Sequence, residues 1–323
     1  MKRFENILYV SEQGVDEKAA VERAVALARN NQARLTIMHA SGEPRLGPLS
    51  EKHTRQEVES LLRERELERL ESLAAPYRAH TDIHLTVRFG IPFIEVVRDV
   101  IRNGRDLAIK AASGDIGVRD RLFGSTDMHL LRKCPCPVWI MRPDDSFNYQ
   151  RILAAVDFDP WESSEVVEEM LNRRILELAG SLALSDFAEL HLVHAWDAPA
   201  EILTRLWGDE STEENTVSYV ASERRLHRAG LERFAAALRG WIGDEGYDYL
   251  SPQLHLPRGN PREAIPALAR ELKTDLLVMG TLARTGITGF IIGNTAESIL
   301  HRIGCSVLAV KPEGFVSPVA PDE

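Results

Sequence analysis

The sequence predicts an α/β fold built from two tandem copies of one doubly wound domain, each with a five-stranded parallel sheet. Short apolar runs rich in β-branched residues alternate with amphipathic helical segments. Within these runs apolar and polar residues do not alternate, which is typical of strands buried on both faces of a parallel sheet. The same succession of segments occurs twice in the same order, which indicates a duplication.

Length and composition agree with two globular domains. A chain of 323 residues is too long for one ordinary core and suits two domains of roughly 150 residues. No stretch reaches the roughly 18 apolar residues of a membrane span, and the first apolar run is too short for a signal peptide. Three cysteines do not make a disulfide scaffold, so we expect a cytoplasmic protein without a membrane span.

The charge of the chain bears on its partners. A formal net charge of −10 disfavours long-range attraction of DNA, RNA or anionic membranes. We therefore expect no nucleic-acid partner. A small anion such as a nucleotide remains compatible, because helix N-termini and backbone amides hold phosphates locally.

Copy one contains five predicted strands separated by helices. The strands are Ile7–Val10, Leu35–His39, Ile83–Val87, Leu107–Lys110 and Val138–Met141. Amphipathic segments predict helices at Glu17–Arg29 and Arg55–Leu73. In copy two, Asp159-Pro160 predicts a helix N-cap followed by proline at the first helical position.

The two copies match collinearly, with an offset that grows in steps. The matching segments are Asn6–Glu12 with Arg151–Asp157 at an offset of 145, Leu35–Ala40 with Leu190–Ala195 at 155, and Gly124–Thr126 with Gly293–Thr295 at 169. The growth places extra surface residues of copy two around its first helix and around residues 199–250. The polar stretch Asp144–Gln150 predicts domains at residues 1–145 and 148–323.

A glycine-rich segment follows the fourth predicted strand of copy two. Ligands of open parallel sheets bind beyond the carboxyl ends of the strands, at the topological switch point. Here the strand Asp275–Met279 leads into the segment Gly280–Thr295 and a helix. Glycines leave amide donors unobstructed and a helix start adds a positive dipole end, which suits a di- or triphosphate.

This segment resembles the nucleotide motif of the universal stress protein family, Gly-x2-Gly-x9-Gly-(Ser/Thr). Copy two has the outer glycines Gly280 and Gly293, but Ala283 replaces the second glycine and Asn294 replaces the hydroxyl residue. Copy one departs instead at the first glycine, where it has Ala111.

The resemblance covers nearly the whole chain. The phrases His129–Pro135 and Gly293–Glu297 resemble the tandem E-type subfamily. The family's fold is Rossmann-like, of the adenine nucleotide alpha hydrolase-like kind. It implies an internal pseudo-dimer of the two domains in which Val138–Met141 lies against Val307–Lys311. The sequence leaves open which protein partners bind and whether a further homo-oligomer forms.

The family implies a stress-response protein that binds ATP or another adenine nucleotide, with or without Mg, and acts through ligand state or partners. Its acidic residue at the end of strand one corresponds to Asp157, or to Glu12 in copy one. Its adenine contact corresponds to Ala195, or to Ala40 in copy one. Copy two is favoured because it retains the acid and the outer glycines. The predicted nucleotide site consists of Ala155, Asp157, Ala195, Gly280, Thr281, Ala283, Arg284, Gly293, Asn294 and Thr295.

Two other functions stay open. One is a slow ATPase, for which Asp157 is the only obvious water-activating group. The other is a binding module for a non-nucleotide, amphipathic ligand beside the segment 290–292. The sequence has no Gly-x4-Gly-Lys-(Ser/Thr) loop, Gly-x-Ser-x-Gly elbow or His-Glu-x2-His motif. We therefore expect no efficient enzyme and name no catalytic residue.

Three features receive structural interpretations. The glycines of the motif also suit tight packing of a loop on the sheet, and this alternative stays open. His39 and His194 recur at the end of strand two and are interpreted as packing and hydrogen-bonding groups. Cys134-x-Cys136 lacks a second cysteine pair for a metal site, and Cys136 recurs as Cys305, so we interpret it as a small buried hydrophobe.

Overall fold

The chain forms two compact units. The computed structural model describes residues 4–44, 54–114, 122–145, 148–161, 166–202, 212–281 and 293–321. Of these, residues 4–145 and 306–321 form the N-terminal unit, and residues 148–281 and 293–305 form the C-terminal unit. The last strand of copy two therefore groups with copy one.

The N-terminal unit contains the predicted five-stranded parallel sheet. Its strands are β1 (Asn6–Ser11), β2 (Arg34–Ser41), β3 (Ile83–Phe89), β4 (Leu107–Ala111) and β5 (Val138–Met141). They run parallel in the order β3-β2-β1-β4-β5. All five predicted strands of copy one are confirmed, and β1, β4 and β5 are buried along their whole length.

A sixth strand completes this sheet. β10 (Ser306–Val310) pairs antiparallel with β5, so that Val307 lies opposite Ile140 and Leu308 opposite Trp139. This confirms the pairing of the two last strands that the sequence predicts. Both strands are buried throughout, so each covers an apolar edge of the other.

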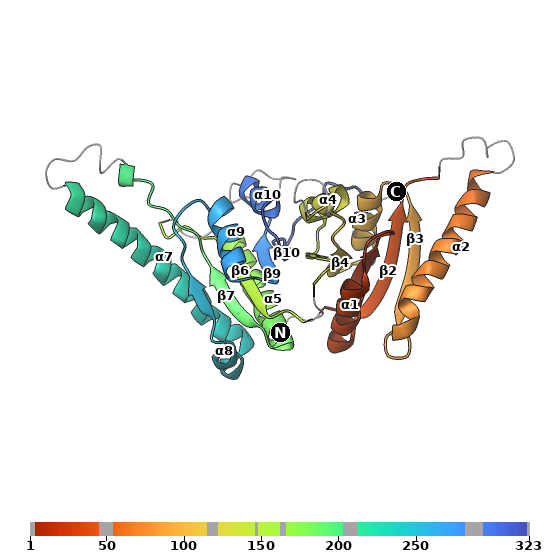
Figure 1. Ribbon diagram of the computed structural model, residues 1–323, viewed down its shortest axis with the longest axis horizontal. Coiled ribbons are helices and arrows are strands. Elements are labelled where there is room, and N and C mark those ends of the chain that lie inside the picture. The colour runs from red at the N-terminus through yellow and green to blue at the C-terminus, as the bar shows by residue number, and fades with distance from the viewer. Residues whose placement is uncertain are drawn as a thin grey trace. The chain divides into compact units, whose positions relative to one another are not determined.

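The helices of the N-terminal unit follow the predicted pattern. They are α1 (Lys18–Asn31), α2 (Arg55–Ala74), the 3-10 turn η2 (Ala75–Tyr77), α3 (Pro92–Asn103) and α4 (Ser125–Lys133). Right-handed crossovers put α1 and α2 on one face of the sheet and α3 and α4, which contact each other, on the opposite face. Thr54 and Glu57 form a capping box at the start of α2, which extends past its strands in Figure 1.

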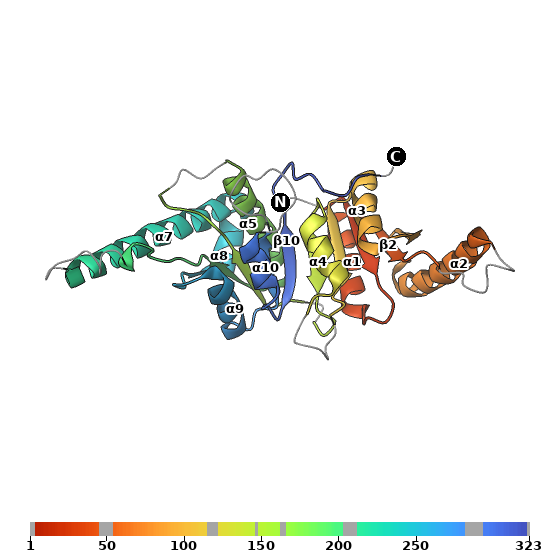
Figure 2. The ribbon, with the colours of Figure 1, turned by 90° about the horizontal axis from the view of Figure 1, so that it is seen from above.

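The C-terminal unit repeats this plan. Its strands are β6 (Arg151–Ala155), β7 (Glu189–Val193), β8 (Gln253–His255) and β9 (Leu276–Gly280), all parallel in the order β9-β6-β7-β8. Its helices are α5 (Val166–Asp186), α7 (Thr212–Ile242), α8 (Asp244–Leu250), α9 (Pro261–Glu271) and α10 (Asn294–Leu300). The helices α5, α7 and α8 contact one another (Figure 2).

Copy two has longer helices than copy one near both positions where the sequence predicts extra residues. α5 has 21 residues where α1 has 14. α7 has 31 residues where α2 has 20, and α8 follows it. The prediction of a helix starting at Pro160 is wrong. Pro160 and Trp161 lie in a bend, and the Asp159 carboxylate accepts a hydrogen bond from the Trp161 amide at 2.8 Å.

Two further observations concern the described residues as a whole. None of their helices is long and apolar enough to cross a membrane. The cysteines Cys134, Cys136 and Cys305, which all lie among these residues, form no disulfide bond and are buried, which agrees with the interpretation of Cys136 as a buried hydrophobe.

Candidate functional site

Those predicted nucleotide residues of copy two that the structure describes lie near the carboxyl ends of its strands. Ala155 ends β6, and it lies opposite Val193 at the end of β7 and Met279 near the end of β9. Asp157 and Ala195 each follow two residues beyond the last residue of β6 and of β7. Because the strands are parallel, their carboxyl ends meet at this edge.

The two ends of the glycine-rich segment lie next to each other. The amide of Gly293 donates to the carbonyl of Thr281, with the two atoms 2.9 Å apart. Gly280 ends β9, and Asn294 and Thr295 begin α10. Two predicted nucleotide residues, Ala283 and Arg284, lie outside the described residues. The same is true of residues 290–292, beside which the alternative amphipathic ligand was expected.

A buried asparagine fixes the backbone at Asp157. The Asp157 amide donates to Asn172 Oδ1 at 3.1 Å, and Asn172 Nδ2 donates to the Asp157 carbonyl at 2.6 Å. The Asp157 residue itself is exposed, whereas Asn172 is buried. The sequence motif predicts Asp157 but not the asparagine from α5 that holds it.

Glycine at position 280 allows close packing against α5. A Cβ atom there would lie 2.8 Å from Leu171 Cδ2 and 3.6 Å from Ile175 Cδ1, both on α5. The first distance is too short for two carbon atoms, so a side chain at this position requires the Leu171 side chain to shift. The packing interpretation that the sequence left open therefore applies to this glycine.

The corresponding loop of copy one carries a buried ion cluster. Lys110 Nζ, near the end of β4, lies 2.8 Å from Asp127 Oδ1 and 2.5 Å from Glu12 Oε2. Asp127 is fully buried and Lys110 is nearly so. Sequence reasoning missed both residues, although a lysine inside an apolar strand was a visible signal.

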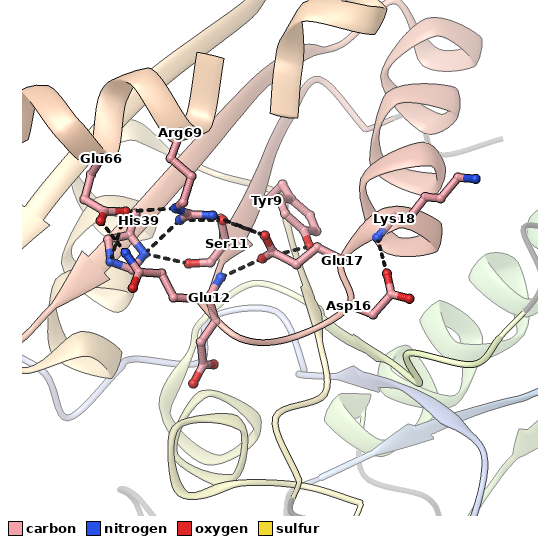
Figure 3. A network of polar contacts seen from close by, with 10 residues as sticks. Tyr9, Ser11, Glu12, Asp16, Glu17, Lys18, His39, Glu66 and Arg69 are labelled. Carbon is pink, nitrogen blue, oxygen red and sulfur yellow. Dashed lines mark hydrogen bonds and ion pairs between the residues drawn. The ribbon is translucent and has the colours of Figure 1, made fainter. Parts of the chain in front are cut away.

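Beside this cluster, Glu17 organises the end of β1 (Figure 3). Its carboxylate accepts hydrogen bonds from Tyr9 Oη at 3.3 Å, from Ser11 Oγ at 2.9 Å and from the Glu12 amide at 2.6 Å. Burial, and secondarily the Glu17 charge, raise the pKa of Tyr9 well above its ordinary value. Glu17 thus holds the loop after β1, as Asn172 does in copy two.

Helix α2 adds a charged group to this network. Arg69 donates to Glu66 Oε2 at 2.9 Å and to Ser11 Oγ at 3.0 Å, and its guanidinium lies 3.5 Å from Glu17 (Figure 3). Gln13 donates to Glu66 from the loop. His39 Nδ1 contacts the Ser11 carbonyl at 3.0 Å, and its Nε2 lies 3.8 Å from Glu66.

An open cavity of about 520 Å³ lies between this loop and α2. Its lining surface is about half polar and half apolar, and it carries both positive and negative side chains. The lining residues are Glu12, Gln13, Gly14, Val15, Glu17, Arg65, Glu66, Glu68, Arg69 and Ser72. Among the described residues, no group of three or more His, Cys, Asp or Glu side chains is arranged to hold a metal ion.

Copy two places aromatic rings where copy one places charges. His194 Nδ1 contacts the Val156 carbonyl at 3.2 Å, and its Nε2 lies 2.8 Å from His227 Nδ1 on α7. Phe158 stacks on His194 with ring centroids 3.9 Å apart. Both strand-end histidines are therefore buried packing and hydrogen-bonding groups, as the sequence predicted.

Comparison with known proteins agrees with the predicted resemblance. A family described as the universal stress protein family matches residues 3–142 and 148–311. The chain is 32% identical to Universal stress protein E of Escherichia coli K12 over 72% of this chain and 69% of that protein. It is 29% identical to Universal stress protein E of Salmonella typhi over 100% and 99% of the two chains.

A solved structure also matches nearly the whole chain. The crystal structure of a functionally unknown protein from Pseudomonas aeruginosa PAO1 matches 96% of this chain and 93% of its own, with a TM-score of 0.69 and 25% identity. The tandem Rossmann-like fold predicted from the sequence is therefore confirmed.

Proposed function

Because the chain belongs to the universal stress protein family, we propose that it binds ATP or another adenine nucleotide in its C-terminal unit. One observation carries this proposal. The joined ends of the glycine-rich segment, Thr281 and Gly293, adjoin the strand edge that bears Asp157 and Ala195. A nucleotide needs these groups together, since its phosphates and its nucleoside are held at once.

The roles follow from the chemistry of each group. We assign the Ala195 backbone to the adenine edge and the exposed Asp157 to the nucleoside. The Gly293 amide already donates to the Thr281 carbonyl, so we assign the phosphates to the next backbone amides, those of Asn294 and Thr295. Mg²⁺ would enter with the phosphates, since they supply the oxygen ligands it prefers. The protein would act in the cytoplasm, where its three cysteine thiols stay reduced.

The test is nucleotide binding by the full chain, because β10 groups with the N-terminal unit and separate halves would split that unit. We expect calorimetry to show ATP binding that Asp157→Ala weakens about tenfold or more. The matched control is Glu12→Ala, the corresponding acid of copy one, which should leave the affinity nearly unchanged. Absence of ATP binding, or loss only in the Glu12 variant, would contradict the proposal. Phosphate release by the same samples separates binding from slow hydrolysis.

A second variant sharpens the assignment of the loop. Ala283→Gly restores the residue that the family motif has at this position, and glycine has wider backbone freedom. We expect ATP affinity to rise or stay unchanged, as measured by the same calorimetry. Weaker binding by a folded variant would mean that the alanine methyl group contacts the ligand.

A further inference from the structure

The amides that border the loop of copy one are already occupied by a carboxylate of the chain. Asp127 Oδ2 accepts hydrogen bonds from the Ser113 amide and from the Gly124 amide, both at 2.9 Å, and from Ser113 Oγ at 3.2 Å. Ser113 and Gly124 stand at the two ends of this loop. A carboxylate from the first turn of α4 thus takes the donors that an incoming anion would need.

A buried lysine balances this carboxylate. Lys110 Nζ lies against Asp127 Oδ1 and Glu12 Oε2 and donates to the Ala111 carbonyl at 2.9 Å. The side chains of Asp127 and Lys110 are 0% and 2% exposed. Such an arrangement persists because removing one charge leaves the other buried and unpaired.

Copy two has none of these three residues at the matching positions. At offsets of 145 and 169, Glu12, Lys110 and Asp127 correspond to Asp157, Met279 and Ala296. Met279 and Ala296 are buried apolar residues. The first turn of α4 has Asp127 three residues after Gly124, whereas α10 has Ala296 at that position and its first-turn acid, Glu297, one residue later. In copy two the Gly293 amide donates to the neutral Thr281 carbonyl and not to a carboxylate. Copy one therefore has a buried ion cluster beside its loop, and copy two has apolar residues at two of the three matching positions.

We propose that copy one is blocked by its own side chain: Asp127, paired with Lys110, takes the Ser113 and Gly124 amides that a phosphate would use. The chain then binds one nucleotide, and these residues decide which copy is used. This rests on the proposed function for the site in copy two. An anion approaching copy one would meet a like charge and no available amide at Ser113 or Gly124.

The test grafts the residues of copy two onto copy one. The variant carries Glu12→Asp, Lys110→Met and Asp127→Ala together. These changes remove the carboxylate from the loop amides and leave no buried lysine charge. The matched control carries the same first two changes with Asp127→Asn. Asparagine keeps an oxygen acceptor for the two amides at nearly the same volume but carries no charge.

We expect calorimetry with ATP and with pyrophosphate to show one more binding site in the graft variant than in the control. The control should keep the wild-type stoichiometry. The comparison is between graft and control, so it holds even if wild-type copy two binds no nucleotide. A graft variant that folds, by circular dichroism, yet gains no site over the control would overturn the proposal. So would a control that gains the same site.

The wild-type chain gives an independent readout if the graft variant does not fold. Photoaffinity labelling with an azido-ATP, followed by peptide mapping, should mark no peptide of copy one. Labelling within residues 105–135 of the wild-type chain would overturn the proposal. Asp157→Ala should reduce the label on copy two, and a wild-type chain that carries no label on copy two would contradict the proposed function instead.

Discussion

The two copies hold the end of their first strand by the same backbone contact but with different side chains. In copy one the Glu17 carboxylate accepts the Glu12 amide, and in copy two the Asn172 amide group binds both the amide and the carbonyl of Asp157. The position of the strand end is thus maintained while a buried charge is gained or lost. A duplicated fold constrains where the backbone goes more strongly than which side chain holds it.

The histidines at the ends of the second strands, His39 and His194, also keep one backbone contact while their other partners differ. His39 Nδ1 contacts the carbonyl of Ser11, which ends β1, and His194 Nδ1 contacts the carbonyl of Val156, one residue beyond β6. Around them the partners diverge: Glu66 and Arg69 surround His39, whereas Phe158 and His227 surround His194. Copy one has become a charged network and copy two an aromatic one, so their ligands need not be the same.

The largest expected effect concerns the strands that both copies contribute to one sheet. Ile140 and Leu308 are fully buried in the β5–β10 pairing. Replacing both by aspartate should cost several kcal/mol, because two charges enter an apolar core without partners. We expect unfolding or aggregation in denaturant titration and sedimentation.

The control for this change is Val316→Asp, since Val316 is 74% exposed. It should be nearly neutral. If the double variant stays compact, soluble and as stable as the control, the pairing of β5 with β10 does not stabilise the fold. The pseudo-dimer predicted for the two domains would then lose its main physical support.

The buried ion pair distinguishes copy one from copy two energetically. Lys110→Met alone leaves Asp127 buried without its cation and should destabilise the N-terminal unit by about 3–5 kcal/mol. The double change Lys110→Met with Asp127→Ala should cost less than either single change, because no charge is left unpaired. Urea unfolding of the three variants measures this coupling. Additive losses would mean that the pair does not interact as its 2.8 Å separation indicates.

A second buried lysine makes stability depend on pH. Burial lowers the pKa of Lys311 from 10.5 to about 7, and its Nζ donates to the Leu131 carbonyl at 2.7 Å. Between pH 7 and 9 the unfolded chain holds a proton on this lysine that the folded chain has released. Stability should therefore rise with pH, by about 2–3 kcal/mol over this window.

Lys311→Met provides the comparison, since other groups titrate in the same range. The difference in unfolding free energy between wild type and this variant should grow with pH above 7 in favour of wild type. Below pH 7 the difference should become constant, because the lysine is charged in both states. A difference that is independent of pH would contradict a lowered pKa.

The sequence predicts the fold better than the site because the two depend on contacts of different range. Buried strands are continuous apolar runs, so all five strands of copy one were predictable locally. The start of α5 was not, since Asp159 caps a bend at Trp161 and no helix begins at Pro160. Local capping patterns do not say which of two hydrogen bonds an aspartate will make.

The ion cluster of copy one depends on residues far apart in the chain. Glu12 and Lys110 are brought together by the pairing of β1 with β4, and Asp127 comes from α4. A family motif reports its own positions, and Lys110 and Asp127 are not among them. Only the folded structure shows that, in copy one, a carboxylate of the chain itself binds the amides at the two ends of this loop.

The smallest effect tests whether a motif glycine serves packing or ligand. Gly280 faces Leu171 so closely that an added Cβ would lie 2.8 Å from its Cδ2, whereas copy one has Ala111 at the same position. We expect Gly280→Ala to destabilise the C-terminal unit by about 1–2 kcal/mol through overpacking. Chemical unfolding measures the loss, and Leu171→Ala in the same chain should reduce it.

Gly304→Ala is the matched control, because an added Cβ there has no neighbour within 4 Å. It should change stability little. ATP affinity then separates the two roles of Gly280. If the glycine serves packing, Gly280→Ala lowers stability in proportion to the contact with Leu171 and changes affinity only slightly. If it serves close approach of a phosphate, affinity falls while stability and its coupling to Leu171 do not change, and the packing account is wrong.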